Sequence, residues 1–327
     1  MNEKSSCEHS RRNDTRLDNF LDCVRDAAAY GLLEEVRTTP KPGLVDLHDN
    51  GSHRDMCYDT FVASTGAVVP YLVEMAKAGW SLDGSPSELF PAIRPIGVRA
   101  EAAMFAATAG VNTHKGIIFS LGIIAACLGY RYRRTGVLDP CEVLELGGLA
   151  TRDWLEQDFD RMKTRPPVTH GEHLFAEYGY RGIRGEAQEG FPALRLFALP
   201  AMKQALAVQP DANRARLHVL LTLMANVDDT NILIRSNPQT LEYAQEEARR
   251  LLLSHPIITN QAMEELAALN REFVARNISP GGCADLLAIA IFFVRLQELM
   301  DERKDRDQPC CKANSAPRKR LTLTWKN

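Results

Sequence analysis

The sequence predicts an all-α protein, a single domain of roughly ten or more helices. Apolar residues recur at helical spacing almost throughout; Phe20, Val24 and Leu32, for example, share one face of the segment 17–36. Strand patterns are nearly absent, and the one short β-like run, residues 232–234, lies between two helical patterns. A chain of 327 residues, 45% of them hydrophobic, is long enough to bury a large core.

Ten helical segments are expected in order along the chain. The fourth contains the longest apolar stretch, residues 116–129, which is shorter than the roughly 20 residues of a membrane span and predicts a buried helix. In the last segment, Ser279 and Pro280 fit the N-cap and the first helical position. The expected helices are residues 17–36, 56–78, 96–108, 115–130, 140–157, 192–208, 212–226, 238–254, 260–277 and 281–303.

The two ends of the chain differ from the predicted catalytic domain, which spans residues 17–304. Residues 1–16 are polar, lack the apolar region of a signal peptide, and are expected to be disordered. Residues 305–327 are polar and become basic, and we interpret them as a mobile, solvated tail. Contact of this tail with nucleic acid or an acidic partner is the alternative interpretation.

The overall composition argues against several functional classes. A net charge of −3 and a pI near 6.3 disfavour a general nucleic-acid binder, which would present a basic face. The absence of a long apolar segment disfavours a membrane protein. The eight cysteines are scattered without zinc-site spacing, which predicts reduced thiols in a cytoplasmic protein.

The segment GVNTHKG, residues 110–116, carries the clearest binding signal. It concentrates Asn112, His114 and Lys115 between two glycines, and an apolar helix follows at once. The unpaired N–H groups of a first helical turn, with a lysine and a histidine beside them, are typical of a phosphate site. A plain helix cap is the alternative interpretation.

Four further junctions between helices are rich in glycine or proline and in charge. Arginine beside glycine suits phosphate contact, and aspartate beside threonine or asparagine is typical of a hard-cation site. Helix caps and hydrated loop charges are the alternatives. The candidates are Lys41, Asp46, His53 and Asp55 from residues 38–56, Arg184 and Glu186 from 180–192, Asn231, Asp229 and Arg235 from 226–235, Ser279 and Asp285 from 276–288, and Glu101 inside the helix before GVNTHKG.

The familiar nucleotide and hydrolase signatures are missing from the chain. There is no P-loop, no Rossmann glycine motif after a strand, no zinc-protease motif and no nucleophile elbow. The remaining anion sites and carboxylates suit a polyphosphate ligand held with Mg²⁺, with carboxylates left for acid–base chemistry.

Six sequence blocks resemble the triphosphoribosyl-dephospho-CoA synthase family. They occur in the order found in that family, between about residue 39 and residue 290, and together they are highly specific. The blocks are TPKPGLVD (39–46), NGSHRDM (50–56), RPIGVRAEAAMFAATAGVNTHKGIIFSLGI (94–123), GIRGEAQEGFP (182–192), DTNILIR (229–235) and RNISPGGCADLL (276–287).

The resemblance implies an all-α enzyme that joins ATP to 3′-dephospho-CoA and releases adenine. The product is the precursor of the prosthetic group of the acyl carrier subunit of citrate lyase or malonate decarboxylase, and a further transferase loads it onto that carrier. The chain departs from the family after Arg235, where Ser236, Asn237 and Pro238 replace the usual glycines. This departure affects the expected backbone geometry around a ligand, whereas the arginine itself is retained.

Residue chemistry at these matching positions suggests a division of roles. Glu101 or Glu186 is expected to act as the general base for the attacking hydroxyl. Asp229 and Asp285 are expected to bind Mg²⁺, with Asp46 and Asp55 as further candidates. Substrate is expected to be held by Lys41, His53, Asn112, His114, Lys115, Arg184, Asn231, Arg235 and Ser279.

Two other functions remain open at this point. One is a Mg²⁺-dependent ribosyl or ADP-ribosyl hydrolase, in which water replaces the 2′-hydroxyl. The other is a non-catalytic helical protein that binds a nucleotide or a partner. The oligomeric state is also open, since periodicity does not separate a homodimer surface from core.

Overall fold

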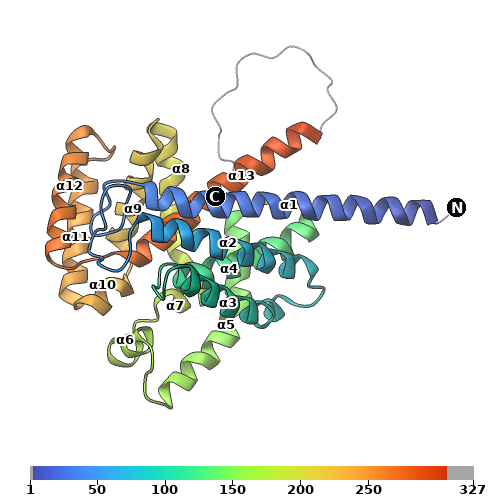
Figure 1. Ribbon diagram of the computed structural model, residues 1–327, viewed down its shortest axis with the longest axis horizontal. Coiled ribbons are helices and arrows are strands. Elements are labelled where there is room, and N and C mark those ends of the chain that lie inside the picture. The colour runs from blue at the N-terminus through green and yellow to red at the C-terminus, as the bar shows by residue number, and fades with distance from the viewer. Residues whose placement is uncertain (1–2, 308–327) are drawn as a thin grey trace, which may run out of the picture.

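The computed structural model describes residues 3–307, and this part of the chain contains helices and no strands (Figure 1). The helices are α1 (Glu3–Arg37), α2 (Tyr58–Ser81), η1 (Pro86–Glu88), α3 (Leu89–Ala107), α4 (Lys115–Thr135), α5 (Pro140–Lys163), α6 (His170–Tyr178), α7 (Gly182–Gln188), η2 (Ala193–Ala198), α8 (Leu199–Val208), α9 (Ala212–Asn226), α10 (Thr230–Arg235), α11 (Pro238–Ser254), α12 (Asn260–Ala275) and α13 (Gly281–Asp307). The all-α prediction is confirmed.

Each of the ten expected segments contains a helix, with shifted boundaries. Helix α3 begins at Leu89, earlier than expected, and contains Pro95, which removes one intrahelical hydrogen bond without ending the helix. The expected helix 192–208 is divided into the π-helical element η2 and α8. The β-like run 232–234 forms part of α10, whose N-cap Asp229 accepts a hydrogen bond from the backbone of Asn231.

Helix α1 begins at Glu3, earlier than the expected start at residue 17. Phe20 is buried in the core, and Leu17 packs against it. The preceding turns carry a polar sequence, and Figure 1 shows them extending away from the other helices. Of the predicted tail, 305–327, the first three residues continue α13, and the rest lies outside the described residues.

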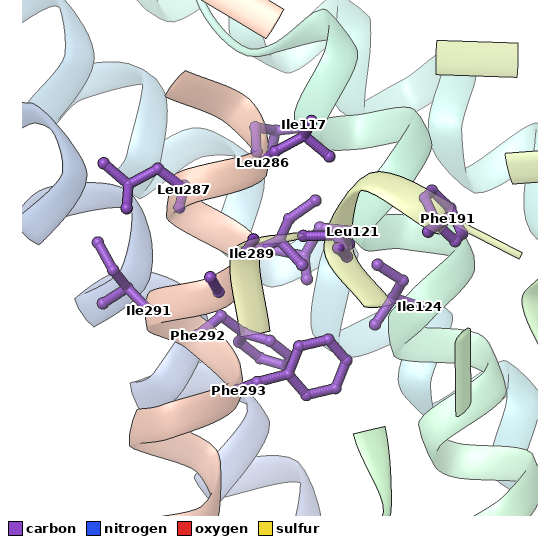
Figure 2. Packing of buried hydrophobic residues seen from close by; sticks show 14 of the residues in the cluster. Ile117, Leu121, Ile124, Phe191, Leu286, Leu287, Ile289, Ile291, Phe292 and Phe293 are labelled. Carbon is purple, nitrogen blue, oxygen red and sulfur yellow. The ribbon is translucent and has the colours of Figure 1, made fainter. Parts of the chain in front are cut away.

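The N-terminal half of helix α13 lies in the core of the protein. It packs on α1, α4, α9, α10 and η2, and every residue from Leu286 to Phe293 is buried. A helix that is apolar on all sides must be enclosed by other helices. Figure 2 shows Leu286 beside Ile117 and Ile289 beside Leu121 of α4, while Ile291 points to the opposite side of α13. Within residues 3–307, no helix combines the length and apolar content needed to cross a membrane.

The first turn of α13 contains Asp285, whereas the residues from Leu286 to Phe293 that follow it are apolar and buried. This first turn lies where α10 and α4 begin and where the loop after α1 folds back onto the α12–α13 connection. Figure 1 shows this loop at the end of the molecule formed by α9 to α12. The fold therefore brings together segments that are up to 250 residues apart, as the pair Glu35–Asp285 illustrates (285 − 35 = 250).

Candidate active site

The candidate site is the junction at which helices α4, α10 and α13 begin. A β-carbon placed on Gly116, in the first turn of α4, would lie 2.1 Å from Oδ2 of Asp285. A β-carbon on Gly282, in the first turn of α13, would lie 3.1 Å from Oδ2 of Asp229. Glycine at both positions therefore allows the backbone to approach a carboxylate. Unpaired N–H groups at helix starts favour negative charge nearby.

Asp229 joins two of these helix starts and is almost fully buried. Its Oδ1 accepts the Asn231 N–H at 2.8 Å, and its Oδ2 accepts the Cys283 N–H at 2.8 Å. Burial raises the pKa of its carboxyl, and these hydrogen bonds act in the opposite direction. The Asn231 side-chain amide lies against Gly281, so α10 and α13 meet directly at this point.

Asp285 is the unsatisfied group of the junction. Within residues 3–307 its carboxylate has no hydrogen-bond or ion-pair partner. Burial, and then the charges of Glu35 and Asp229, raise its pKa well above the ordinary range. The residue is partly exposed, and a carboxylate that can be reached from outside and stands among other carboxylates without a counter-charge points to a bound ligand.

Glu35 and Lys41 form a buried ion pair next to these aspartates. Their side chains are only 7% and 1% exposed. Burial raises the pKa of Glu35, while the Lys41 ammonium lowers it. Lys41 is therefore not presented to solvent as a free phosphate-binding group. Glu35 was not predicted from the sequence, because a glutamate at the end of an amphipathic helix normally faces water.

The loop after α1 uses Asp46 as an internal hydrogen-bond acceptor. Its Oδ1 accepts the N–H groups of His48 and Asp49 at 2.8 and 3.1 Å. Its Oδ2 accepts the Thr39 hydroxyl at 2.7 Å and the Lys41 N–H at 3.2 Å. All four contacts hold the loop to itself, so this carboxylate has an evident structural role.

His53 links the same loop to α10 and to the start of α13. Its Nδ1 lies 2.9 Å from a nitrogen of the Arg235 guanidinium, and its Nε2 lies 2.9 Å from Oγ of Ser279. Burial and the Arg235 charge lower the pKa of His53 to about 4. Asp55 is 63% exposed, with a carboxylate oxygen 3.9 Å from the imidazole, at the edge of this group.

The GVNTHKG segment precedes α4 as expected, although its side chains point to different partners. The Asn112 carboxamide accepts the Lys115 N–H at 3.3 Å and so helps to cap the helix. His114 is buried, with its Nδ1 2.7 Å from the Ser64 hydroxyl, and burial lowers its pKa to about 4. The Lys115 ammonium lies 2.9 Å from the Glu101 carboxylate.

The α7 segment reaches the junction through its first residue. A β-carbon on Gly182 would lie 3.1 Å from Cγ2 of Thr230, at the start of α10. One turn later, Glu186 accepts the Ala193 N–H at 3.0 Å, and burial raises its pKa to about 7. Arg184 contacts the Met162 sulfur at 3.7 Å and has no carboxylate partner among the described residues.

The four predicted metal ligands do not form one cluster. Asp229 and Asp285 interact electrostatically, whereas Asp46 is engaged within its loop and Asp55 lies at the surface. In the part of the chain that the structure describes, no three histidine, cysteine, aspartate or glutamate side chains form a group that could hold a metal ion. The geometry offers two aspartates, and a metal ion bound by them would need further oxygen ligands from the substrate.

A separate cavity of about 410 Å³ lies between α8, α9 and the α11–α12 connection. Its walls include Val208, Leu252 and Ile257, with Arg214 and His218 as polar groups. None of the residues predicted from the sequence lines it.

Comparison with known proteins connects this geometry to a family. Residues 22–304 match the family model CitG, described as ATP:dephospho-CoA triphosphoribosyl transferase. The chain is similar to proteins named as probable 2-(5″-triphosphoribosyl)-3′-dephosphocoenzyme-A synthases from Vibrio cholerae (39% identity; 86% of this chain and 90% of the relative) and Streptococcus mutans (37%; 84% and 96%). A relative from Escherichia fergusonii carries the same name without the word probable (39%; 82% and 89%). No solved structure matches the chain.

Proposed function

The chain belongs to the family of ATP:dephospho-CoA triphosphoribosyl transferases, and from this premise we propose that the junction of α4, α10 and α13 is its active site. There the triphosphoribosyl group of ATP is transferred to 3′-dephospho-CoA and adenine is released. The observation that carries the proposal is Asp285, which stands beside Asp229 and Glu35 and has no partner among the described residues. Such an arrangement is costly in an unliganded protein and useful in one that binds charged substrates.

The reaction exchanges one bond at the anomeric carbon for another. The C1′–N9 bond of ATP breaks, and a bond forms between C1′ and the 2′-oxygen of dephospho-CoA. The 2′-hydroxyl proton passes to a base, adenine leaves with a proton, and the triphosphate is retained. By analogy with glycoside hydrolysis, positive charge develops on the ribose in the transition state. Buried carboxylates near that ribose stabilise this charge, and rigid positioning lowers the entropic cost.

Between the two predicted bases, we assign the role to Glu186. A general base works best when its pKa is near the operating pH, and burial raises the pKa of Glu186 to about 7. Glu101 instead pairs with Lys115 at 2.9 Å, which suits orientation of the ammonium. Replacing Glu186 with Gln should lower kcat by about 10²–10³-fold. The acid limb of the kcat profile, centred near pH 7, should disappear with it.

The substrate phosphates are assigned to groups with unused charge or hydrogen-bonding capacity. Lys115 is about half exposed, and Arg184 has no carboxylate partner among the described residues. His114, Asn112 and Asn231 line the helix starts around them. Lys41 was expected to bind phosphate, but its ammonium is buried against Glu35. We propose that Lys41 affects the phosphates only through the charge that it brings to the junction.

A divalent cation fits this site in the two-carboxylate form typical of Mg²⁺ bound with a nucleotide. Asp229 and Asp285 would hold it, since both are oxygen donors and Asp285 has no competing partner among the described residues. When bound, Mg²⁺ supplies charge neutralisation to the triphosphate. We further infer that a carrier-loading transferase takes the product, for citrate lyase or malonate decarboxylase. A reducing cytoplasm suits the five described cysteines, which are free.

The decisive experiment is mass spectrometry of the products formed from ATP, Mg²⁺ and 3′-dephospho-CoA. Free adenine and a triphosphoribosyl adduct should appear together in equal amounts. Adenine without the adduct would mean that water replaces the 2′-hydroxyl and that the chain is a hydrolase. Tight ATP binding with neither product would indicate a binding protein.

A further inference from the structure

Three side chains from three segments form a continuous hydrogen-bonded line at the start of α13. Arg235 of α10 contacts Nδ1 of His53 at 2.9 Å, and Nε2 of His53 contacts Oγ of Ser279 at 2.9 Å. Arg235 is held in place by the backbone carbonyl of Ser52 and the Asn277 carboxamide, both at 2.9 Å. The line is therefore anchored at its arginine end.

The chemistry of the donors fixes the direction of this line. A guanidinium has only donors, so Nδ1 of His53 must accept. The proton of the neutral imidazole then sits on Nε2, which donates to Oγ of Ser279. The low pKa of His53, caused by burial and by Arg235, is consistent with a neutral ring. With its oxygen already accepting, the Ser279 hydroxyl is left to act as a donor.

The Ser279 hydroxyl has no acceptor among residues 3–307, although the residue is only 1% exposed. The N–H groups of Gly281 and Gly282 also have no acceptor in this part of the chain. These three donors belong to the same turn of backbone. Ser279 is buried, whereas Gly281 and Gly282 are partly exposed, so a ligand that reached the two N–H groups would lie beside the hydroxyl and could supply acceptors to all three.

We propose that Arg235 and His53 are positioning residues that orient the Ser279 hydroxyl as a donor to a phosphate oxygen of the nucleotide. This inference rests on the proposed function for the identity of the nucleotide. The acceptor is an anionic oxygen because the line begins at a guanidinium and ends beside the positive end of a helix. Arg235 thus acts on the ligand through His53, without touching it.

The test measures binding of inorganic tripolyphosphate with Mg²⁺ by calorimetry, which requires no catalysis. Ser279→Ala should weaken binding about tenfold, the loss of one charge-assisted hydrogen bond. His53→Asn places an amide near Nδ1, leaves Ser279 without its donor, and should weaken binding about fivefold. His53→Gln places a donor near Nε2 and should recover binding to within about twofold of the wild-type value.

The double variant separates positioning from general disruption. If His53 acts through Ser279, the effect of His53→Asn should vanish in the Ser279→Ala background. An equal effect in both backgrounds, or normal tripolyphosphate binding by Ser279→Ala, would overturn the proposal. Failure of the wild-type protein to make the triphosphoribosyl product would instead count against the proposed function, while the binding cycle would still decide the role of the three residues.

Discussion

Asp46 and Asp285 lie at the same end of the molecule, but their carboxylates differ in hydrogen bonding. Asp46, in the loop after α1, accepts four hydrogen bonds from its own loop. Asp285, in the first turn of α13, has no partner within the described residues. Both carboxylates interact electrostatically with Glu35, so the contrast does not come from distance to that charge.

The comparison distinguishes a carboxylate that stabilises the structure of the site from one that is available to bind a ligand. A fully bonded buried carboxylate stabilises the fold, and its removal leaves donors unsatisfied. An unbonded one destabilises the fold and is retained for another reason. Identical side chains at equally polar sequence positions can thus have opposite effects on stability and activity.

The sharpest test of this contrast is Asp285→Asn, with the largest expected effect. Activity should fall about 10³-fold, or roughly 4 kcal/mol in transition-state free energy, because a preorganised charge is lost. The folded protein should be at least as stable as the wild type at neutral pH, since an uncompensated carboxyl is removed. Steady-state kinetics and thermal unfolding of the same preparation would measure both.

The stability gain from Asp285→Asn should depend on pH in a defined direction. Burial raises the folded-state pKa of Asp285 above its value in the unfolded chain, which is about 3.9. The unfolded state therefore releases this proton first as the pH rises, and the carboxyl costs stability above that pKa. The advantage of the variant should shrink as the pH falls toward 4. An advantage that grew on acidification would contradict the assignment.

The matching test on the other side is Asp46→Asn. An amide in place of Oδ2 sets a donor against the Lys41 N–H, so that hydrogen bond is lost, while the Thr39 hydroxyl must turn to accept instead of donate. Unfolding in urea should show a loss of about 1–3 kcal/mol. Asp55→Asn is the control, because Asp55 is 63% exposed. Equal stability of both variants would remove the distinction between Asp46 and the surface carboxylates.

Sequence reasoning located the segments of the site better than the roles of their residues. Periodicity predicts the helices and thereby puts Asp285 and the GVNTHKG motif at helix starts, whereas α10, which begins after Asp229, was not among the expected helices. It does not show which oxygens are already used, so Asp46 and Asp285 appear equivalent in the sequence. The partner groups of Asp46 become evident only when the loop closes on itself.

Glu35 illustrates a second limit of the sequence. The pair Glu34–Glu35 ends a helical pattern and is typical of a solvated face, yet Glu35 is buried against Lys41. Its burial depends on α13, which lies about 250 residues later in the chain. Ser64 was missed for the same reason, since its contact with His114 joins α2 to the start of α4. Local patterns carry no signal for such pairings.

A smaller effect is expected when the surroundings of Asp285 are changed and the carboxylate is kept. A β-carbon at Gly116 would lie 2.1 Å from Oδ2, so Gly116→Ala should rotate the Asp285 side chain. Activity should fall about 10–100-fold, since small misplacements in a site are costly. Gly66→Ala in α2 is the control, because its β-carbon meets nothing within 4 Å. It should leave activity unchanged and stabilise the protein by about 0.5–1 kcal/mol.

The smallest effect is expected at Lys115 and Glu101. Unlike Asp285, these two side chains are paired with each other, and they are 51% and 32% exposed. If Lys115 binds the triphosphate equally in the ground and transition states, Lys115→Ala should raise the KM for ATP about tenfold and leave kcat unchanged. Because the Lys115 side chain is 51% exposed, added salt should reduce the difference in the KM for ATP between Lys115→Ala and the wild type. Glu101→Gln should change the KM in the same direction only if the carboxylate orients the ammonium. A loss of kcat in Glu101→Gln, with normal kcat in Glu186→Gln, would place the general base at Glu101 instead of Glu186.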